Sequence, residues 1–266
     1  MTNKSNYIIG GVIGDIIGSV YEFNNVKKTD FDFFTARTCF TDDTVLTIAT
    51  MDSILNSKDY NKSYQYYGRK YPKSGYGQNF ISWLISDNPQ PYNSWANGSA
   101  MRVSPVGWAY DSIKDVLLYS KQSAEVSHNH PEGIKGAQAV ATAVFLARKN
   151  KSKNEIKQYI TDTFGYDLNR SIDSIRPHYG FKVSCQESVP EAIIAFLEST
   201  DYESAIRLAI SLGGDSDTIA CIAGSIAEAY YKEVPIEIIE KSLSYLPDEF
   251  INVIELFSNK FGSKNH

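Results

Sequence analysis

Apolar residues return along most of the chain with the 3.6-residue period of an amphipathic helix. In segment 188–197, Val189, Ile193 and Leu197 fall on one stripe, which places Pro190 in the first turn, where its missing N–H costs nothing. The same period predicts helices over residues 43–55, 131–149, 152–163, 202–212, 219–231 and 235–245. No segment alternates apolar and polar residues for long enough to build a sheet. We therefore predict an all-α fold of about a dozen helices.

Two irregular stretches interrupt this helical pattern. Residues 71–77 (YPKSGYG) and 87–98 (DNPQPYNSWANG) are rich in turn-forming and aromatic residues. They are too aromatic for simple spacers, so we expect them to form walls of a pocket, and two ordinary loops with packed rings are the alternative. No linker, charge block or low-complexity tract divides the chain. The sequence thus predicts one compact domain over residues 1–266.

Composition and charge narrow the classes of function. The 266 residues hold 26 Lys and Arg against 31 Asp and Glu, so the net charge is −5 and offers little attraction for nucleic-acid phosphates. Three widely spaced cysteines without zinc-ligand spacing are typical of a reduced, cytoplasmic protein. The apolar run 7–20 contains Asp15 and is too short to cross a bilayer. We expect a soluble, cytoplasmic monomer with no nucleic-acid or membrane partner.

Two short motifs rich in hydroxyl and carboxylate groups precede apolar helices, at residues 40–44 (FTDDT) and 213–218 (GGDSDT). Either motif alone fits an ordinary helix N-cap, because acidic and hydroxyl side chains favour that position. Together they supply four carboxylates, which would repel one another if the two helix starts met, unless cations lay between them. Oxygen ligands of this kind suit Mg²⁺ or Mn²⁺ rather than zinc, and two ions are the natural number for four carboxylates.

A glycine-rich segment near the N-terminus adds two further acidic residues. Gly10, Gly14 and Gly18 lie on one helical face and favour close helix–helix packing, while their spacing does not match the dinucleotide-binding fingerprint. Asp15 and Glu22 are seven residues apart and project from the same side. We expect this pair to present an acid toward the two acidic motifs.

Two polar segments in the middle of the chain complete the candidate chemistry. Residues 97–102 (NGSAMR) place a glycine and several backbone N–H groups ahead of a helix, which suits phosphate binding, with Arg102 as a structural or an anion partner. Residues 127–133 (SHNHPEG) contain His128 and His130. No third nitrogen or sulfur ligand stands nearby, so ring stacking or hydrogen bonding is favoured over metal binding.

Taken in order, five segments resemble the ADP-ribosylglycohydrolase family, which includes bacterial dinitrogenase-reductase-activating glycohydrolases and animal ADP-ribosyl-acceptor hydrolases. They are residues 11–22 (GVIGDIIGSVYE), 40–44 (FTDDT), 97–102 (NGSAMR), 127–137 (SHNHPEGIKGA) and 213–224 (GGDSDTIACIAG). The resemblance implies a compact all-helical fold with a binuclear Mg²⁺ or Mn²⁺ site at the base of an ADP-ribose cleft.

The resemblance also implies a role for each matching residue. The implied metal ligands are Thr41, Asp42, Asp43, Asp215, Asp217 and Thr218. Glu22 matches a glutamate that touches a metal or gates the site in some members, and the candidates for catalytic proton transfer are Glu22, Asp42 and Asp43. The implied substrate-binding residues are Asn97, Gly98, Ser99 and Met101 near the diphosphate and ribose, and His130, with His128 as second choice, beside the adenosine end.

Two features depart from the family pattern. Ala96 stands where a glycine often precedes the Asn-Gly pair. Some bacterial members carry an aspartate just upstream of this loop that is suggested to assist catalysis, whereas Ser94 or Trp95 stands there in this chain and no Asp or Glu occurs between residues 88 and 110. This difference argues against a mechanism that depends on such an acid, and it indicates a different leaving group.

The leading hypothesis is a metal-dependent hydrolase that releases ADP-ribose from a modified protein side chain, with arginine as the favoured acceptor. Hydrolysis of a small conjugate such as O-acetyl-ADP-ribose is the alternative with the same fold and metals. A non-catalytic ADP-ribose-binding protein is disfavoured, because a degenerate member should lose its metal ligands and this chain keeps four aspartates and two threonines. An unrelated two-metal phosphohydrolase accepts the same ligands but leaves residues 97–102 and 127–133 unexplained.

Overall fold

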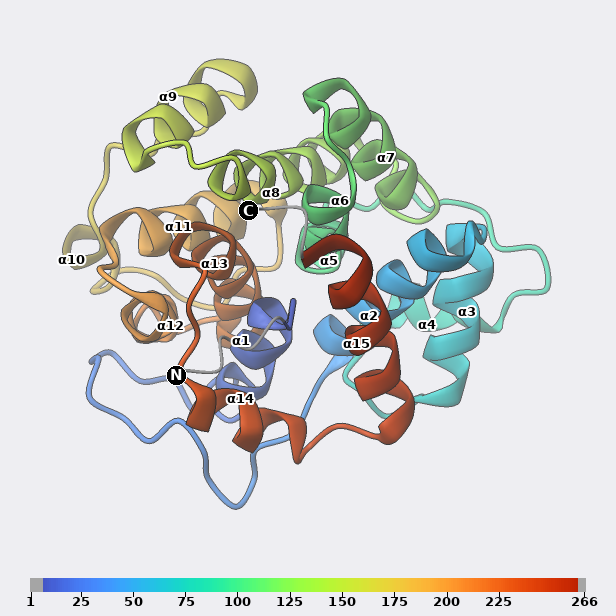
Figure 1. The fold of residues 1–266 in the computed structure, drawn as a ribbon, viewed down its shortest axis with the longest axis horizontal. Helices are drawn as coiled ribbons and strands as arrows, with labels where there is room; N and C mark the ends of the chain where they lie inside the picture. Colours follow the sequence, from blue (N-terminus) through green and yellow to red (C-terminus); the bar gives the residue numbers. More distant parts are fainter. Residues whose placement is uncertain (1–6, 263–266) are drawn as a thin grey trace.

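Helices supply all the regular structure between residues 7 and 262, the part of the chain that this computed structural model describes. In chain order (Figure 1) they are α1 (Gly10–Gly18), α2 (Asp42–Asn56), α3 (Tyr60–Lys70), α4 (Gln78–Ile85), α5 (Gly98–Met101), α6 (Ser104–Ala109), α7 (Ile113–Glu125), α8 (Pro131–Arg148), α9 (Lys153–Phe164), α10 (Ile172–Ile175), α11 (Cys185–Glu198), α12 (Tyr202–Ser211), α13 (Ser216–Tyr231), α14 (Ile236–Leu243) and α15 (Asp248–Phe261). The predicted all-α fold is confirmed. Residues 1–6 and 263–266 of the predicted domain lie outside the described residues.

The centre of the fold is α13, which packs against α1, α8, α11 and α12 (Figure 1). It packs most closely against α1, because glycines on α1 allow the two backbones to come into contact. A Cβ atom added at Gly14 would stand 2.2 Å from the carbonyl oxygen of Ala220. The predicted packing role of the glycine-rich face of α1 is therefore confirmed, and it fixes the distance between two helices that carry site residues.

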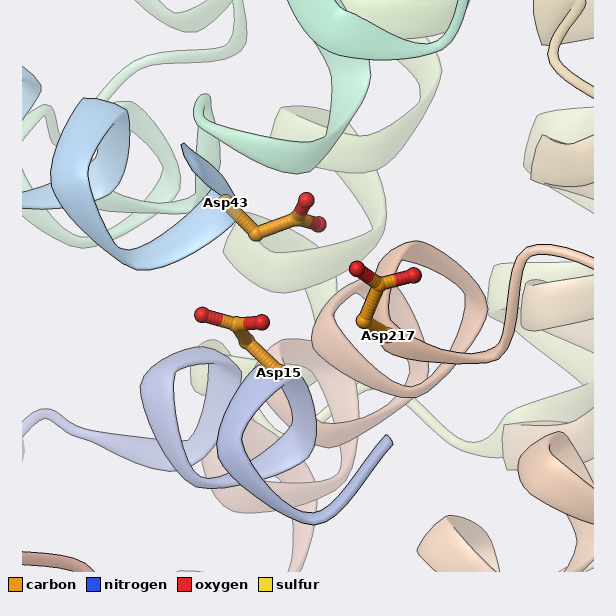
Figure 2. A group of neighbouring side chains, drawn as sticks. All are labelled: Asp15, Asp43 and Asp217. Carbon is orange, nitrogen blue, oxygen red and sulfur yellow. The ribbon is translucent and has the colours of Figure 1, made fainter. Parts of the chain in front are cut away.

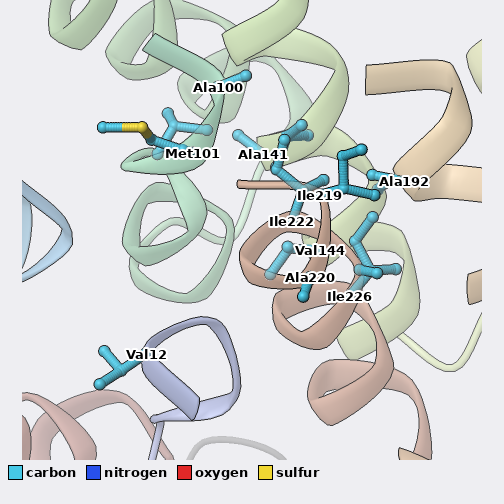
Figure 3. Close-up of a cluster of buried hydrophobic side chains, with 14 of the residues drawn as sticks. Val12, Ala100, Met101, Ala141, Val144, Ala192, Ile219, Ala220, Ile222 and Ile226 are labelled. Carbon is cyan, nitrogen blue, oxygen red and sulfur yellow. The ribbon is translucent and has the colours of Figure 1, made fainter. Parts of the chain in front are cut away.

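The core combines alanine with branched aliphatic side chains (Figure 3). Ile219 and Ile222 of α13 are fully buried and lie among side chains of α5, α8 and α11. The small residues Ala141 and Ala192 keep α8 and α11 close to α13. No helix among residues 7–262 is long and apolar enough to span a membrane.

One predicted helix starts three residues earlier than its apolar stripe indicates. The helix predicted over 188–197 begins at Cys185, so Pro190 lies inside α11 rather than in its first turn, and this expectation was wrong. The additional first turn is polar, with Glu187 hydrogen-bonded to Ser184 (Oγ to Oε2, 2.8 Å), and it therefore carries no apolar signal. Proline at this position removes one backbone hydrogen bond from the helix.

Both acidic motifs begin helices, as predicted. Thr41 is the N-cap of α2 and accepts a hydrogen bond from the Asp43 N–H, and Asp215 is the N-cap of α13. The predicted start of the second helix, residue 219, was three residues late, so Asp217 and Thr218 stand in the first turn of α13. These two helix starts form the floor of a cleft.

Candidate metal and substrate site

Asp15 joins α1 to the start of α2. Its side chain is fully buried and receives four hydrogen bonds from two threonines. Thr41 donates its N–H to Oδ2 (2.9 Å) and its hydroxyl to Oδ1 (2.7 Å), while Thr44 donates its N–H (3.1 Å) and its hydroxyl to Oδ2. Asp15 therefore caps α2 from a neighbouring helix, and it directs the lone pairs of the Thr41 hydroxyl away from itself.

The starts of α2 and α13 lie against each other. The Thr218 hydroxyl donates to Oδ2 of Asp43 over 3.2 Å, although the two residues are 175 positions apart. Carboxylate oxygens of Asp15, Asp43 and Asp217 lie within 4.8 Å of one another, and Figure 2 shows these side chains pointing together from three helices. The expected meeting of the two acidic motifs is confirmed.

Asp217 belongs to a second acidic group as well. Oxygens of Glu22, Asp215 and Asp217 also lie within 4.8 Å of one another. Glu22 follows the end of α1, so the helix that supplies Asp15 also leads the chain to this second group. Two adjacent clusters that share one carboxylate are a suitable arrangement for two neighbouring cations.

The electrostatics of the cluster favour bound cations. Burial and then the charge of Asp217 raise the pKa of Asp43 well above its usual range, and burial and then Asp215 do the same to the pKa of Asp217. Burial, Asp217 and Asp15 raise the pKa of Glu22 to about 8. Within residues 7–262, no Lys, Arg or His forms an ion pair with these carboxylates.

One oxygen of the cluster also has no donor. Oδ1 of Asp43 is buried without a hydrogen-bond partner. An unpartnered carboxylate oxygen among other carboxylates is costly to bury unless a cation neutralises it. The donor set, all oxygen with no nitrogen or sulfur, fits a hard divalent ion such as Mg²⁺ or Mn²⁺.

The cleft above these carboxylates encloses about 510 Å³, which is within the usual range for small-molecule sites. Its floor contains the six implied metal ligands, namely Thr41, Asp42, Asp43, Asp215, Asp217 and Thr218, with Glu22 at one side. Residues 75–80 and 92–98 supply lining on other sides, so both irregular stretches contribute walls, as expected. Phe23, Phe181 and Val183 also line it, and periodicity could not identify them because they lie outside helices.

Asn97 connects the wall of the cleft to its floor. Its side-chain amide donates to Oδ2 of Asp215 (2.7 Å) and to the hydroxyl of Ser188 (3.1 Å). Burial raises the pKa of Asp215 to about 6, although the bond from Asn97 opposes the rise. Asn97 therefore orients a carboxylate of the floor as well as facing the cleft.

Gly98, Met101 and His128 also line the cleft. A Cβ atom at Gly98 would lie 3.0 Å from Nε2 of His128. The absence of a side chain at Gly98 therefore leaves room for the imidazole ring beside this part of the wall. Burial and then the charge of Arg102 lower the pKa of His128 well below its usual range, so the ring is neutral at physiological pH. The Met101 sulfur lies 3.7 Å from the Thr218 hydroxyl oxygen.

Ser99 and His130 do not line the cleft. Ser99 is fully buried and donates to the carbonyl of Gly133 over 2.8 Å. His130 is the N-cap of α8: its Nδ1 accepts the Glu132 N–H over 3.1 Å, which turns the ring back toward its own helix. Of the two histidines, it is thus the second choice, His128, that faces the cleft.

Arg102 is fully buried and is also one of the residues that line the cleft. Its fully buried guanidinium lies 4.2 Å from the centre of the Tyr64 ring and donates to Ser123 and Ser127. These contacts fit a structural role. Nε and Nη1 of Arg102 are buried without an acceptor, which fits the role of an anion partner as well.

Comparisons with known proteins agree on one family. A profile of the ADP-ribosylglycohydrolase family matches residues 6–262. ADP-ribosylhydrolase ARH3 of Homo sapiens is 28% identical over 84% of this chain and 84% of its own length, and ARH3 of Bos taurus is 28% identical over 86% and 85%. A putative ADP-ribosyl glycohydrolase of Acanthamoeba polyphaga mimivirus is 25% identical over 86% and 87%. A solved structure described as an ADP-ribosylglycohydrolase-related protein complex has the same fold, with a TM-score of 0.73, 21% identity and 95% of each chain covered.

Proposed function

Because the chain belongs to the ADP-ribosylglycohydrolase family, we propose that it hydrolyses the bond between the distal ribose of ADP-ribose and an acceptor held over the acidic floor of the cleft. Membership of the family and similarity to ARH3 identify the protein as a glycosyl hydrolase that acts on ADP-ribose conjugates. The identity of the acceptor, the metal and the residue roles are our proposals.

The proposed site rests mainly on one observation: two helix starts from opposite ends of the chain meet in the fold. As a result, Asp217 belongs to two neighbouring groups of carboxylates. We assign the binding of two divalent ions to Thr41, Asp42, Asp43, Asp215, Asp217 and Thr218, with Glu22 beside the second group. When bound, such ions supply a polarised water molecule and an anchor for ribose hydroxyls.

The protein's own side chains bind and orient the substrate, and one of them accepts a proton. Water adds to the ribose C1″ as the bond to the acceptor breaks. A carboxylate takes the proton that the water loses and passes it to the leaving acceptor, so that the carboxylate returns to its starting state. Glu22, Asp42 and Asp43 are the carboxylates we propose for this transfer. Asn97 and Gly98 hold the wall of the cleft beside the diphosphate and ribose, and neutral His128 serves as a hydrogen-bonding group rather than a charge.

The acceptor has two candidates. An arginine side chain of a protein is the acceptor expected from the sequence. An oxygen-linked acceptor, which includes small conjugates such as O-acetyl-ADP-ribose, is favoured by the wall of residues 92–98. Ser94 and Ala96 line the cleft there without any carboxylate to pair with a guanidinium.

A panel of substrates tests the proposal. We would measure the release of free ADP-ribose from arginine-linked and serine-linked ADP-ribosyl peptides and from O-acetyl-ADP-ribose, with Mg²⁺, with Mn²⁺ and with chelator. The expected result is metal-dependent release from at least one conjugate, lost in an Asp42→Asn/Asp43→Asn variant. The matched control is Asp162→Asn, on the exposed face of α9. Absence of release from all three conjugates by folded protein in the presence of both metals would contradict the proposal.

A further inference from the structure

Two aromatic rings are exposed together at the mouth of the cleft. Phe23 is 84% exposed and Phe181 is 51% exposed, and the rings stack with centroids 5.9 Å apart and an interplanar angle of 21°. Val183, 48% exposed, lines the same cleft. Single exposed apolar residues are common in proteins, but a group at the edge of a binding site marks an interaction surface. We call Phe23, Phe181 and Val183 the aromatic rim.

The Phe23 side of the rim is fixed to the turn that precedes Asp215. Asn25 accepts the Gly214 N–H (2.8 Å) and donates to the Gly214 carbonyl (3.1 Å). The Lys27 ammonium donates to the carbonyls of Tyr179 (2.6 Å), Arg176 (3.1 Å) and Leu212. The loop that carries Phe23 is therefore bonded both to the turn before α13 and to the loop that carries Phe181.

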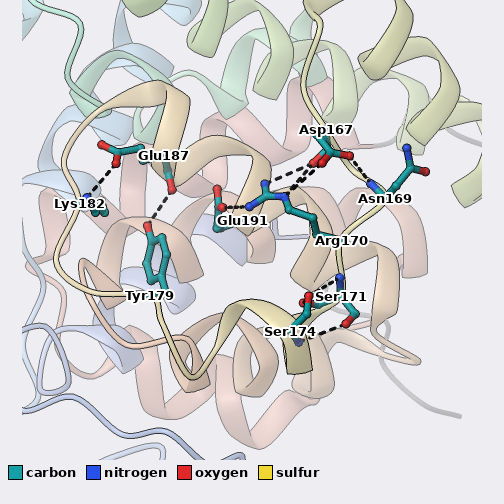
Figure 4. Close-up of polar contacts among 9 residues, drawn as sticks. All are labelled: Asp167, Asn169, Arg170, Ser171, Ser174, Tyr179, Lys182, Glu187 and Glu191. Carbon is teal, nitrogen blue, oxygen red and sulfur yellow. Dashed lines mark hydrogen bonds and ion pairs between the residues drawn. The ribbon is translucent and has the colours of Figure 1, made fainter.

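The Phe181 side is held from α11 (Figure 4). The Tyr179 hydroxyl donates to the carbonyl of Glu187 (2.9 Å), and Lys182 forms an ion pair with the Glu187 carboxylate (2.9 Å). A Cβ atom at Gly214 would stand only 2.5 Å from the Gly180 carbonyl, so this loop rests directly on the Gly213–Gly214 turn. Both rings are thus attached to the turn that positions Asp215. Because their loops are already held in place, binding of a partner costs little conformational entropy.

The position of the rim identifies which part of a substrate reaches it. Glu22 directly precedes Phe23, and its carboxylate lies within 4.8 Å of those of Asp215 and Asp217. If the scissile bond lies over these carboxylates, the group beyond it toward the solvent is the acceptor. An acetyl group has too few atoms to extend past Glu22 onto two open rings, whereas a polypeptide continues across them.

We propose that the aromatic rim binds the polypeptide next to the modified residue, so that this enzyme prefers protein-linked ADP-ribose to small conjugates. The proposal rests on the proposed function and specifies its substrate class. Flat, rigid rings bind aliphatic and aromatic side chains, and also the stems of long cationic side chains, without dependence on one sequence. The rim therefore contributes to affinity for the polypeptide rather than to bond cleavage.

The test compares two substrates with the same bond. One is an ADP-ribosylated peptide, with the linkage that the wild type cleaves, and the other is the corresponding single amino acid joined to ADP-ribose. We expect the wild type to have the higher kcat/KM for the peptide. A Phe23→Ser/Phe181→Ser variant should lose roughly tenfold of kcat/KM for the peptide, mainly through KM, as expected when apolar contacts are removed. For the amino-acid conjugate, the same variant should differ from the wild type by less than about twofold.

A matched control is Leu256→Ser on α15, which removes a side chain that is 52% exposed and does not line the cleft. It should leave both substrates unaffected, and equal melting temperatures establish that all variants are folded. An equal loss on both substrates would overturn the proposal, because the rings would then act on ADP-ribose or on the floor. An unchanged peptide KM would overturn it as well. Failure of the wild type on both substrates would instead contradict the proposed function itself.

Discussion

Asp15 accepts four hydrogen bonds at the centre of the acidic floor, and its role differs from that of its neighbours. Each of its oxygens already has a donor, whereas Oδ1 of Asp43 has none. We therefore assign Asp15 to positioning and leave cation binding to the residues around it. It holds Thr41 and Thr44, and through them the first turn of α2, from which Asp42 and Asp43 project.

Replacing Asp15 by Asn tests this assignment. An amide nitrogen would face one of the four donors, and a buried donor left without an acceptor costs about 1–3 kcal/mol. Asp15→Asn should therefore lower the free energy of unfolding and weaken Mn²⁺ binding, which thermal unfolding and calorimetric titration measure. Asp162→Asn serves as the exposed control. Unchanged stability together with unchanged affinity would contradict the positioning role.

Glu228 provides a test that is independent of the metal site. This buried carboxylate accepts the Ile9 N–H (2.8 Å) at the start of α1, and burial raises its pKa from 4.5 to about 7. Because the folded state holds the proton more tightly than the unfolded state, stability is greatest at acidic pH and falls between about pH 4.5 and pH 7.

The Glu228→Gln variant lacks this titration. Relative to that variant, the wild type should lose on the order of 3 kcal/mol of unfolding free energy between pH 4.5 and pH 7.5, from a shift of 2.5 pKa units. Denaturant unfolding at a series of pH values measures the difference. Parallel stability curves for the two proteins would show that Glu228 does not titrate in this range.

At the scale of single residues, the sequence identified the carboxylates well because helix N-caps have recognisable chemistry. Thr41, Asp42, Asp43 and the motif around Asp217 could be found from residue type and the apolar helix that follows. The four hydrogen bonds of Asp15 and the turned ring of His130 could not, since each depends on contacts that residue type alone does not specify.

Among the helices, the contact of α1 with α13 determines how far Asp15 lies from Asp217. Their backbones approach through glycine, and nothing near Gly14 is a flexible side-chain end that can move aside. The separation of the two carboxylates is therefore set by helix packing. A change in the spacing of the two helices should alter the distance between Asp15 and Asp217.

Gly14→Ala is the corresponding prediction. The added methyl group would meet backbone atoms of Ala220 and Cys221 at 2.2 to 2.8 Å, so we expect a destabilisation of about 3 kcal/mol and weaker Mn²⁺ binding. Gly180→Ala, at a glycine with nothing within 4 Å of the new atom, should change stability little. Denaturant unfolding compares the two, and equal stabilities would show that α1 and α13 can separate without cost.

Several helices with a long apolar stripe were predicted, whereas α3, α7 and α15 were not. The period in α8 and α12 gave their bounds to within one residue. The start of α11 was missed because its first turn is polar, and the short helices α4, α5 and α6 carry too few residues for a period to be recognised. The positions of these short helices depend on packing against α2, α3, α7 and α8. Such tertiary contacts cannot be predicted from a local sequence pattern.

At the scale of the whole molecule, the fold brings segments from both ends of the chain into one cleft. The order of five motifs predicted the family, and the family predicted that the acidic motifs meet. The aromatic rim could not be predicted, because Phe23 and Phe181 are 158 positions apart in irregular segments and become neighbours only through the Gly213–Gly214 turn.

We predict that the accumulated negative charge of the floor makes the stability of the molecule depend on metal. Cations bound there relieve the repulsion among the carboxylates, so chelator-treated protein should gain unfolding free energy on addition of Mg²⁺ or Mn²⁺, by about 2.7 kcal/mol at a hundredfold excess over Kd. The gain should shrink at lower pH, where protons compete for the same oxygens. Thermal unfolding measures both effects, and Asp217→Asn, which removes the shared carboxylate, should abolish most of the gain. A melting temperature that is insensitive to both ions would contradict the proposed cation site.

We propose that the acidic floor makes this chain a metal-dependent ADP-ribosyl hydrolase. The most direct measurement is the rate of ADP-ribose release from an ADP-ribosylated polypeptide by chelator-treated protein as Mg²⁺ or Mn²⁺ is restored. We predict that release returns with the ion in the wild type and fails to return in Asp217→Asn at the same concentrations. Release by the chelator-treated wild type at its full rate, or an Asp217→Asn variant as active as the wild type, would contradict this proposal.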